Sequence, residues 1–161
     1  MTEYAIVPAE PVHAVRLARN LNPADRAEIE AASGADPYLV ILNGMRVSPD
    51  TRTGLADGKV VCMFGCVPPR SLFQYAATPW LLGTPLIKKH ARRFLLESRV
   101  YFEQMKQQHK LLVNYVDVRH TDAQRWLSWM GFTLDPPKPH GVLQLPFRRF
   151  EARQECVNQQ P

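Results

Sequence analysis

The stretch that decides the fold covers residues 111–134, LLVNYVDVRHTDAQRWLSWMGFTL. Its first part, Leu111–Val118, is apolar and rich in β-branched residues, which predicts a buried strand. The turn His120–Asp122 then offers polar capping groups, so Ala123–Met130 is expected to form a short amphipathic helix. Gly131 follows where helices commonly end in a left-handed residue, and the aromatic residue after it begins another strand. The stretch therefore predicts a strand–helix–strand unit.

Apolar periodicity and turn residues predict the elements on either side of this unit. The expected elements are a strand at 4–7, helices at 11–20, 22–33 and 37–47, a weak strand at 51–56, a hairpin turn at 57–58, strands at 59–67 and 75–82, a long helix at 85–108, a proline-rich loop at 135–139 and a last strand at 141–150. The segment 37–47 fits a helix by its spacing, although its β-branched content leaves a strand open. This order is typical of an α/β (α+β) protein, with one domain over residues 1–153 and a polar, frayed tail at 154–161.

Length and composition place the chain among ordinary globular proteins. Its 161 residues are 45% hydrophobic and 22% charged, which suffices for one buried core. The N-terminal sequence lacks the basic and apolar regions of a signal peptide. No apolar run approaches the length of about 18 residues that a membrane span requires. We therefore expect a cytoplasmic protein without a membrane span.

The three cysteines argue against a disulfide framework and against a metal site. Cys62 and Cys66 lie in one expected strand, which places them about 13 Å apart at about 3.3 Å per residue. Two cysteines at that distance cannot form a disulfide, and they make a poor zinc half-site. Small buried side chains are the favoured interpretation, and no metal ligands are expected.

The formal net charge of +5 reflects two clusters of basic residues. The first cluster comprises Lys88, Lys89, Arg92 and Arg93, and the second comprises Arg148, Arg149 and Arg153. Two interpretations stay open: a solvated helix face with a basic tail, or a patch with affinity for nucleic acid, an acidic protein or an anionic ligand. No recognition helix, zinc finger or set of stacking aromatic residues accompanies the charges, so a dedicated nucleic-acid motif is not indicated.

The order of elements and the segment HTDAQRWLSWMGF at 120–132 resemble the GNAT acyltransferase superfamily. Many members carry an Asn, an Ala three residues later, an aromatic–Tyr pair at six and seven, and Gly-Phe at eleven and twelve. Ala123, Trp126, Gly131 and Phe132 keep this frame without insertion. The resemblance implies a GNAT-like fold, in which helices flank a mixed, mostly antiparallel twisted sheet.

Two departures from the family frame concern its chemistry. Members that use acetyl-CoA have a glycine-rich loop after the fourth strand, where backbone N–H groups approach the pyrophosphate. The corresponding junction at 81–93, LLGTPLIKKHARR, retains only Gly83, and Pro85 removes one donor. The Tyr that protonates the departing thiolate corresponds to Leu127, and the Asn that contacts the cofactor corresponds to His120. Both departures predict that acetyl transfer by the usual route is lost and that no cofactor is bound.

A closer resemblance is to small GNAT-like proteins of short-tailed phages, which are internal virion or morphogenesis proteins. The segments that carry it are Asn114–His120, Pro79–Thr84 and Cys62–Gly65. It implies a non-catalytic virion-associated or morphogenesis protein with other virion proteins as partners, located in the host cytoplasm during assembly or within the virion. Two alternatives stay open: an acetyl-CoA-dependent N-acetyltransferase with an atypical pyrophosphate loop, and a basic phage protein that contacts DNA.

The candidate site residues belong to the enzyme alternative. Asp117 and His120 are the candidates for acid–base catalysis, because Asp117 lies near the end of the buried strand, His120 follows that strand, and both carry titratable groups. The candidates for binding the phosphates of acetyl-CoA are Gly83, Thr84, Lys88 and Lys89. Backbone donors and ammonium groups would meet the anion there, at the start of the long helix.

Overall fold

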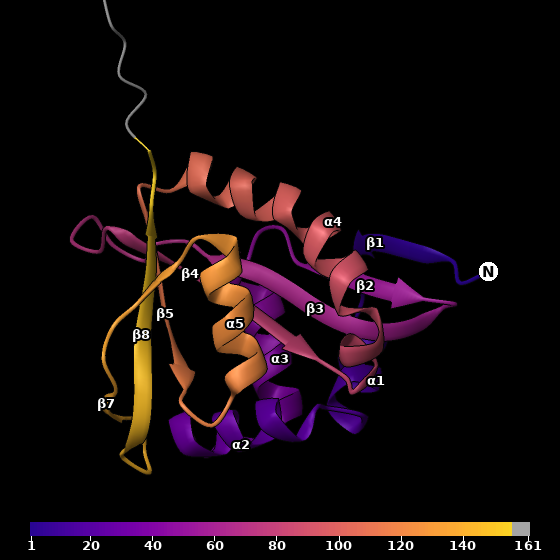
Figure 1. The fold of residues 1–161 in the computed structure, drawn as a ribbon, viewed down its shortest axis with the longest axis horizontal. Coiled ribbons are helices and arrows are strands. Elements are labelled where there is room, and N and C mark those ends of the chain that lie inside the picture. The colour runs from indigo at the N-terminus through magenta and orange to yellow at the C-terminus, as the bar shows by residue number, and fades with distance from the viewer. Residues whose placement is uncertain (156–161) are drawn as a thin grey trace, which may run out of the picture.

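A computed structural model of the chain describes residues 1–155. The described part contains five helices and eight strands in one sheet (Figure 1). In chain order they are β1 (Tyr4–Pro8), α1 (Pro11–Arg19), α2 (Pro23–Ala32), α3 (Pro37–Val47), β2 (Arg52–Ala56), β3 (Lys59–Val67), β4 (Ala76–Gly83), α4 (Leu86–Gln108), β5 (Leu111–Asp117), α5 (Thr121–Met130), β6 (Thr133–Leu134), β7 (Lys138–His140) and β8 (Leu145–Arg153). The predicted mixed α/β class is confirmed.

The sheet has the order β1-β2-β3-β4-β5-β8-β6, and β7 pairs with β8 as well. Every pair is antiparallel except β4 with β5. Asp57 and Gly58 both have positive φ, as a tight hairpin turn between β2 and β3 requires, which confirms the predicted turn. A parallel pair needs a long crossover, and α4 supplies it between β4 and β5.

Helices cover both faces of the sheet (Figure 1). Successive residues of a strand point to opposite faces, and β3 shows the consequence. Met63 packs in a hydrophobic cluster with α1 and α3, whereas Phe64 packs in another cluster with α4. One face is therefore covered by the N-terminal helices and the other by the long helix, and the two sets of helices stay apart.

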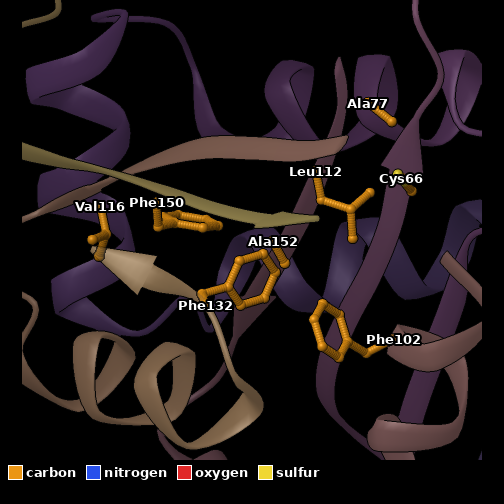
Figure 2. Close-up of a cluster of buried hydrophobic side chains, with 8 residues drawn as sticks. All are labelled: Cys66, Ala77, Phe102, Leu112, Val116, Phe132, Phe150 and Ala152. Atoms are coloured by element: carbon orange, nitrogen blue, oxygen red, sulfur yellow. The ribbon is translucent and has the colours of Figure 1, made fainter. Parts of the chain in front are cut away.

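The predicted unit at 111–134 folds as β5, α5 and β6, and it supplies a third hydrophobic cluster (Figure 2). Phe132 lies at its centre, with ring centroids 4.7 Å from Phe102 of α4 and 5.0 Å from Phe150 of β8. Gly131 ends α5 with a φ of +97°, in the left-handed region where glycine is favoured. The retained family positions Gly131 and Phe132 therefore stop the helix and fill the core.

The helices α2 and α3 begin at residues whose side chains cap them. The Asn22 side chain accepts the N–H of Ala24, and proline occupies the first turn of α2. The Asp36 side chain accepts the N–H groups of Tyr38 and Leu39. This cap explains why segment 37–47 is a helix despite its β-branched residues.

The prediction of a strand at 141–150 is wrong in its bounds. Residues 141–144 form a turn, and β8 begins only at Leu145 and continues to Arg153. Gly141 has a φ of +75°, which interrupts an extended chain. The turn lies against the end of α2, since the N–H of Val142 donates to the carbonyl of Ala32 over 3.1 Å. The short strand β7 occupies part of the expected loop, where its Pro139 is tolerated because β7 pairs on one side only.

The chain leaves the sheet after β8, where the N–H of Gln154 donates to the carbonyl of Lys110 over 3.0 Å. Residues 156–161 of the predicted frayed tail lie outside the described residues, and the domain boundary at 153 stays a prediction. Cys62 and Cys66 are buried free thiols, and burial raises the pKa of Cys62 to about 12. Within residues 1–155, no helix is long and apolar enough to cross a membrane.

Candidate functional site

The candidate site is a cleft between β4 and β5. These strands pair only at Ala76–Leu111 and Ala77–Leu112, and they separate beyond this point. The first gap is bridged by a side chain, because Nδ2 of Asn114 donates to the carbonyl of Pro79 over 2.9 Å. Beyond Asn114 a cavity of about 450 Å³ opens. Its volume lies within the range of small-molecule sites, which is about 300–1,000 Å³.

The cavity reaches both faces of the sheet. On the face of α2 and α3 its lining includes Glu28, Ile29, Val40, Trp80, Tyr115 and His140. On the face of α4 and α5 its lining includes Leu81, Leu95, Met105, Trp126, Leu127 and Met130. No residue of α5 is fully buried, because its apolar side faces this space. Two ligands could therefore enter from opposite faces and meet between the strands.

The alternation of peptide groups along β4 directs the N–H of Leu81 into the cleft. Peptide groups alternate in direction along a strand, so those that point away from β3 recur at every second residue. Pro79 and Gly83 belong to this set, since the Pro79 carbonyl accepts from Asn114 and the Gly83 N–H donates to Asp25. Leu81 lies between them and is 39% exposed, although β4 is a central strand. Its N–H can donate to a carbonyl oxygen bound in the cleft.

Asp25 of α2 connects the two strands at the open end of the cleft. Its Oδ2 accepts the N–H of Gly83 over 2.8 Å, and its Oδ1 lies 2.7 Å from Nε2 of His120. Nδ1 of His120 accepts the N–H of Ala123, so the ring also caps α5. Burial disfavours the charged imidazolium, but the hydrogen bond and charge of Asp25 outweigh it and raise the pKa of His120. This pair holds the starts of α4 and α5 together.

Glu28 lies one helical turn after Asp25 and lines the cavity. Its Oε2 accepts the N–H of Asp117 over 2.9 Å, and among the described residues this is the one hydrogen bond of the Glu28 carboxylate, which leaves Oε1 for a ligand. Burial raises the pKa of Glu28 to about 7, and the charges of Asp25 and Asp117 add to the rise. The Asp117 N–H and His120 lower this pKa in part. A carboxyl group that titrates near neutral pH can take up and release a proton at physiological pH.

Asp117 is held by its neighbour Arg119. Nη2 of Arg119 lies 2.6 Å from Oδ2 of Asp117, and Nε lies 3.0 Å from Oδ1. Burial alone would raise the pKa of Asp117, but the bonds from Arg119 lower it below the usual value. Both carboxylate oxygens are engaged, and Asp117 is not among the residues that line the cavity. The geometry therefore favours Glu28 over Asp117 as the acid–base group.

Two of the predicted cofactor residues have their polar groups engaged within the protein. The Gly83 N–H is bound by Asp25, and the Gly83 carbonyl accepts the N–H of Asn22. The hydroxyl of Thr84 is buried and donates to the carbonyl of Val60 over 3.0 Å. Neither residue offers a free donor to an anion in this arrangement.

The other two predicted cofactor residues are exposed lysines at the start of α4. Lys88 lines the cavity, and its Nζ lies 3.6 Å from Oδ2 of Asp122. Lys89 points to solvent and does not line the cavity. Of the four predicted residues, Lys88 is thus the one that reaches the cleft.

No protein-family model and no curated protein sequence matches this chain. Solved structures do match it. The yncA protein of Salmonella typhimurium, solved with its cofactor acetyl-CoA, has a TM-score of 0.70 at 13% identity and covers 99% of this chain and 98% of that chain. A ribosomal-protein-alanine N-acetyltransferase of Brucella melitensis has a TM-score of 0.66 at 14% identity, over 92% of this chain and 99% of that chain. An acetyltransferase of the GNAT family from Streptococcus pneumoniae has a TM-score of 0.63 at 14% identity, and the match covers 95% of this chain and 100% of that chain.

This chain has the GNAT fold. The fold predicted from the segment at 120–132 is therefore confirmed, and a likeness at these identities establishes the fold alone. The cavity of this GNAT fold lies between β4 and β5, because this parallel pair separates early. The crossover helix α4 joins the two strands.

The prediction of a phage virion-associated or morphogenesis protein without catalysis is wrong. The similar structures are acetyltransferases, and one of them contains acetyl-CoA. The prediction gave most weight to the absence of the glycine-rich loop and to Leu127 in place of a Tyr. Both features lie at the border of the cleft. The cleft itself is open, because β4 and β5 separate. The predicted phage relationship, the DNA-contacting phage alternative and the expectation of no cofactor have no support in these comparisons.

The chain fits one part of acetyl-CoA better than the other. The cavity and the N–H of Leu81 suit a thioester arm between the strands. At the β4–α4 junction, however, the N–H of Thr84 donates to Val61, that of Ile87 donates to Thr84, and Pro85 has none. The backbone therefore offers few donors to a pyrophosphate, and the basic side chains at the start of α4 remain to hold it.

Sequence reasoning missed Glu28, although the pattern of α2 contained a signal. Asp25, Glu28, Ile29 and Ala32 follow the spacing of one helix face, and all four line the cavity. Two acids on an apolar face are unusual, because a buried carboxylate needs partners. This pattern could have identified α2 as a wall of the site.

Proposed function

We propose that the protein is an acetyl-CoA-dependent N-acetyltransferase with an atypical pyrophosphate site. The observation that carries the proposal is the cleft between β4 and β5, which is open to both faces of the sheet and bordered by the N–H of Leu81 and the carboxyl group of Glu28. The fold of acetyltransferases supports it. When bound, acetyl-CoA would supply an acetyl group activated as a thioester.

The residues of the α4 and α5 face would hold the donor. Leu81 can donate its N–H to the acetyl carbonyl oxygen, where negative charge develops during acyl transfer. Lys88 and Lys89 offer ammonium groups to the phosphates, and the N-terminal end of α4 adds its partial positive charge. Leu95, Trp126 and Leu127 line this part of the cavity and would shield the arm from water. In this arrangement, side chains bind the phosphates in place of backbone N–H groups.

Glu28 would accept the proton of the acceptor amine. An amine attacks only in its neutral form, so a base must take its proton before or during the attack. Oε1 of Glu28 is free and reaches the cavity, while Oε2 is fixed by the N–H of Asp117. The raised pKa of Glu28, about 7, suits this task near neutral pH.

Leu127 cannot protonate the departing sulfur. A thiol has an ordinary pKa of about 8.5, so it leaves as a thiolate without an acid more readily than an alcohol would. The missing acid therefore predicts a slower reaction, since general acids contribute about 10²- to 10⁴-fold. It does not remove the route.

Isothermal titration with acetyl-CoA, followed by a thiol-release assay with a panel of amines, tests the proposal. We expect binding in the wild type, and a loss of affinity of about tenfold or more in K88E/K89E, since both phosphate-binding charges are reversed. The matched control is K59E/K110E, which makes the same charge change at two exposed lysines away from the cavity. Absence of acetyl-CoA binding in the wild type would refute the proposal.

A further inference from the structure

We infer that the acceptor is a small primary monoamine with an apolar body, and that Glu28 binds its ammonium group in the α2 and α3 half of the cavity. This inference rests on the proposed function for the reaction, but amine binding itself can be measured without a donor. Three features of the cavity carry it. They are one free carboxylate oxygen on Glu28, apolar and aromatic walls around it, and the distance from Glu28 to Arg70, the cation that lines the far end of the cleft.

The free carboxylate oxygen belongs to Glu28. Among the described residues, the acids that line the cavity are Asp25, Glu28 and Asp122. Both oxygens of Asp25 are bound, by Gly83 and His120. Asp122 lies beside Lys88 on the opposite face. Oε1 of Glu28 is thus the one lining carboxylate oxygen on the α2 face without a partner, and it can hold a single ammonium group.

The surroundings of Glu28 favour a cation. Asp25 lies on the same helix, and Asp117 contacts Glu28 through its N–H. The nearby cations are already paired: Arg119 with Asp117, and His120 with Asp25. An ammonium group at Oε1 would therefore meet net negative charge, and it would offset the cost of burying the Glu28 carboxylate.

The walls around Oε1 favour an apolar body. Ile29, Val40 and Trp80 line this half of the cavity. Tyr115 and His140 are stacked with ring centroids 3.9 Å apart and an interplanar angle of 10°, and both line the cavity. These surfaces suit an alkyl or aryl group, and they offer few partners to the amides of a peptide.

A polyamine fits less well, because its additional ammonium groups would lack free carboxylates and would meet the apolar wall. The lining cation at the other end of the cleft is Arg70, on the loop between β3 and β4. Arg70 follows Val67, which pairs with Thr78, whereas Glu28 lies one helical turn from Asp25, which binds Gly83. Five residues of strand separate these two levels, which is about 16 Å at about 3.3 Å per residue. A small amine at Glu28 does not reach Arg70.

Titration of the protein with phenethylamine and hexylamine, followed by NMR in the absence of donor, tests the inference. We expect saturable binding by the wild type, with shifts at Glu28, Trp80 and Tyr115. E28Q keeps an acceptor for the Asp117 N–H, so it should fold, and we expect its affinity to fall at least tenfold because the charge is lost. E30Q, an exposed position on the same helix, should bind like the wild type.

The pH dependence gives a second readout. Affinity of the wild type should rise as the pH increases through about 7, since Glu28 then becomes charged, whereas E28Q should show no such rise. Asp25, Asp117, Arg119 and His120 face Glu28, and His140 of β7 lines the same half of the cavity; these groups are present in both proteins and serve as a common background.

Tighter binding of spermidine or of an alanine-initiated peptide than of phenethylamine would overturn the inference, and so would equal affinity in E28Q. Amine binding without any acetyl transfer would refute the proposed function and leave the amine-binding site at Glu28 standing. Acetyl transfer to a different class of amine, with no binding of phenethylamine or hexylamine, would refute the inference and support the proposed function.

Discussion

The carboxylate of Asp25 accepts the peptide N–H of Gly83 over 2.8 Å at the end of β4. This hydrogen bond places a carboxylate at the β4–α4 junction, where the family resemblance implies that phosphate is bound through the backbone. The same carboxylate pairs with His120, so α2 is fixed across the end of the cleft. The bond thus defines the geometry of the site and removes one donor from it.

We expect D25N to lower the free energy of unfolding by about 1–3 kcal/mol, because the buried His120 loses a charged partner. Urea unfolding at pH 6 measures the change. The control is D50N, which removes a charge from the exposed pair of Asp50 and Arg52 and should cost less than about 1 kcal/mol. Equal effects of the two substitutions would contradict the structural role of Asp25.

Glu28 should make stability depend on pH in a defined window. Its pKa is raised from 4.5 to about 7 in the folded protein, so the folded state binds the proton more tightly than the unfolded state. The resulting stabilisation is fully present below pH 4.5 and is lost as the pH rises through about 7. Relative to E28Q, the wild type should lose up to about 3 kcal/mol over this window. Unfolding curves of both proteins at pH 5 and pH 8 check this; a difference that does not change with pH would disprove it.

A hydroxyl group introduced at position 127 should raise the rate of acetyl transfer. Under the proposed function, L127Y should raise the turnover number about tenfold or more, since a phenol could protonate the departing sulfur. L127F introduces the same ring without the hydroxyl and serves as the matched variant. Thiol release at saturating donor and amine is the measurement. A similar gain in both variants would show that ring volume, and not proton transfer, is responsible.

Gly141 should tolerate a side chain worse than Gly58. Both have positive φ, at +75° and +72°, so alanine costs about 1–2 kcal/mol at either position from backbone strain. At Gly141 a Cβ atom would also lie 2.6 Å from Cα of Ala32, whereas at Gly58 nothing lies within 4 Å. We expect G141A to lower the melting temperature several degrees more than G58A does. Calorimetry compares them, and equal shifts would mean that the turn can move away from α2.

Local sequence patterns predicted most elements of the fold because their causes lie within a few residues. The side chains of Asn22 and Asp36 each accept the peptide N–H of the residue two positions later, at the start of a helix. Gly131 ends α5 by its own backbone conformation. The start of β8 could not be placed in this way, since the turn before it is held by α2 through the Val142 N–H. The phage interpretation failed for a related reason: it weighed single residues around a cleft whose existence depends on strand separation.

The sequence by itself determined the strand–helix–strand unit at 111–134, the helix end at Gly131 and the hairpin turn at 57–58, since periodicity and turn chemistry act locally. Only the tertiary structure decided that β4 and β5 separate after two residue pairs. It also decided that Asp25 meets His120 across 95 positions and that Glu28 meets Asp117 across 89. An apolar pattern tells which side of a helix is buried, but not which groups it will meet there. The cleft and its carboxylates therefore exist only in the folded chain.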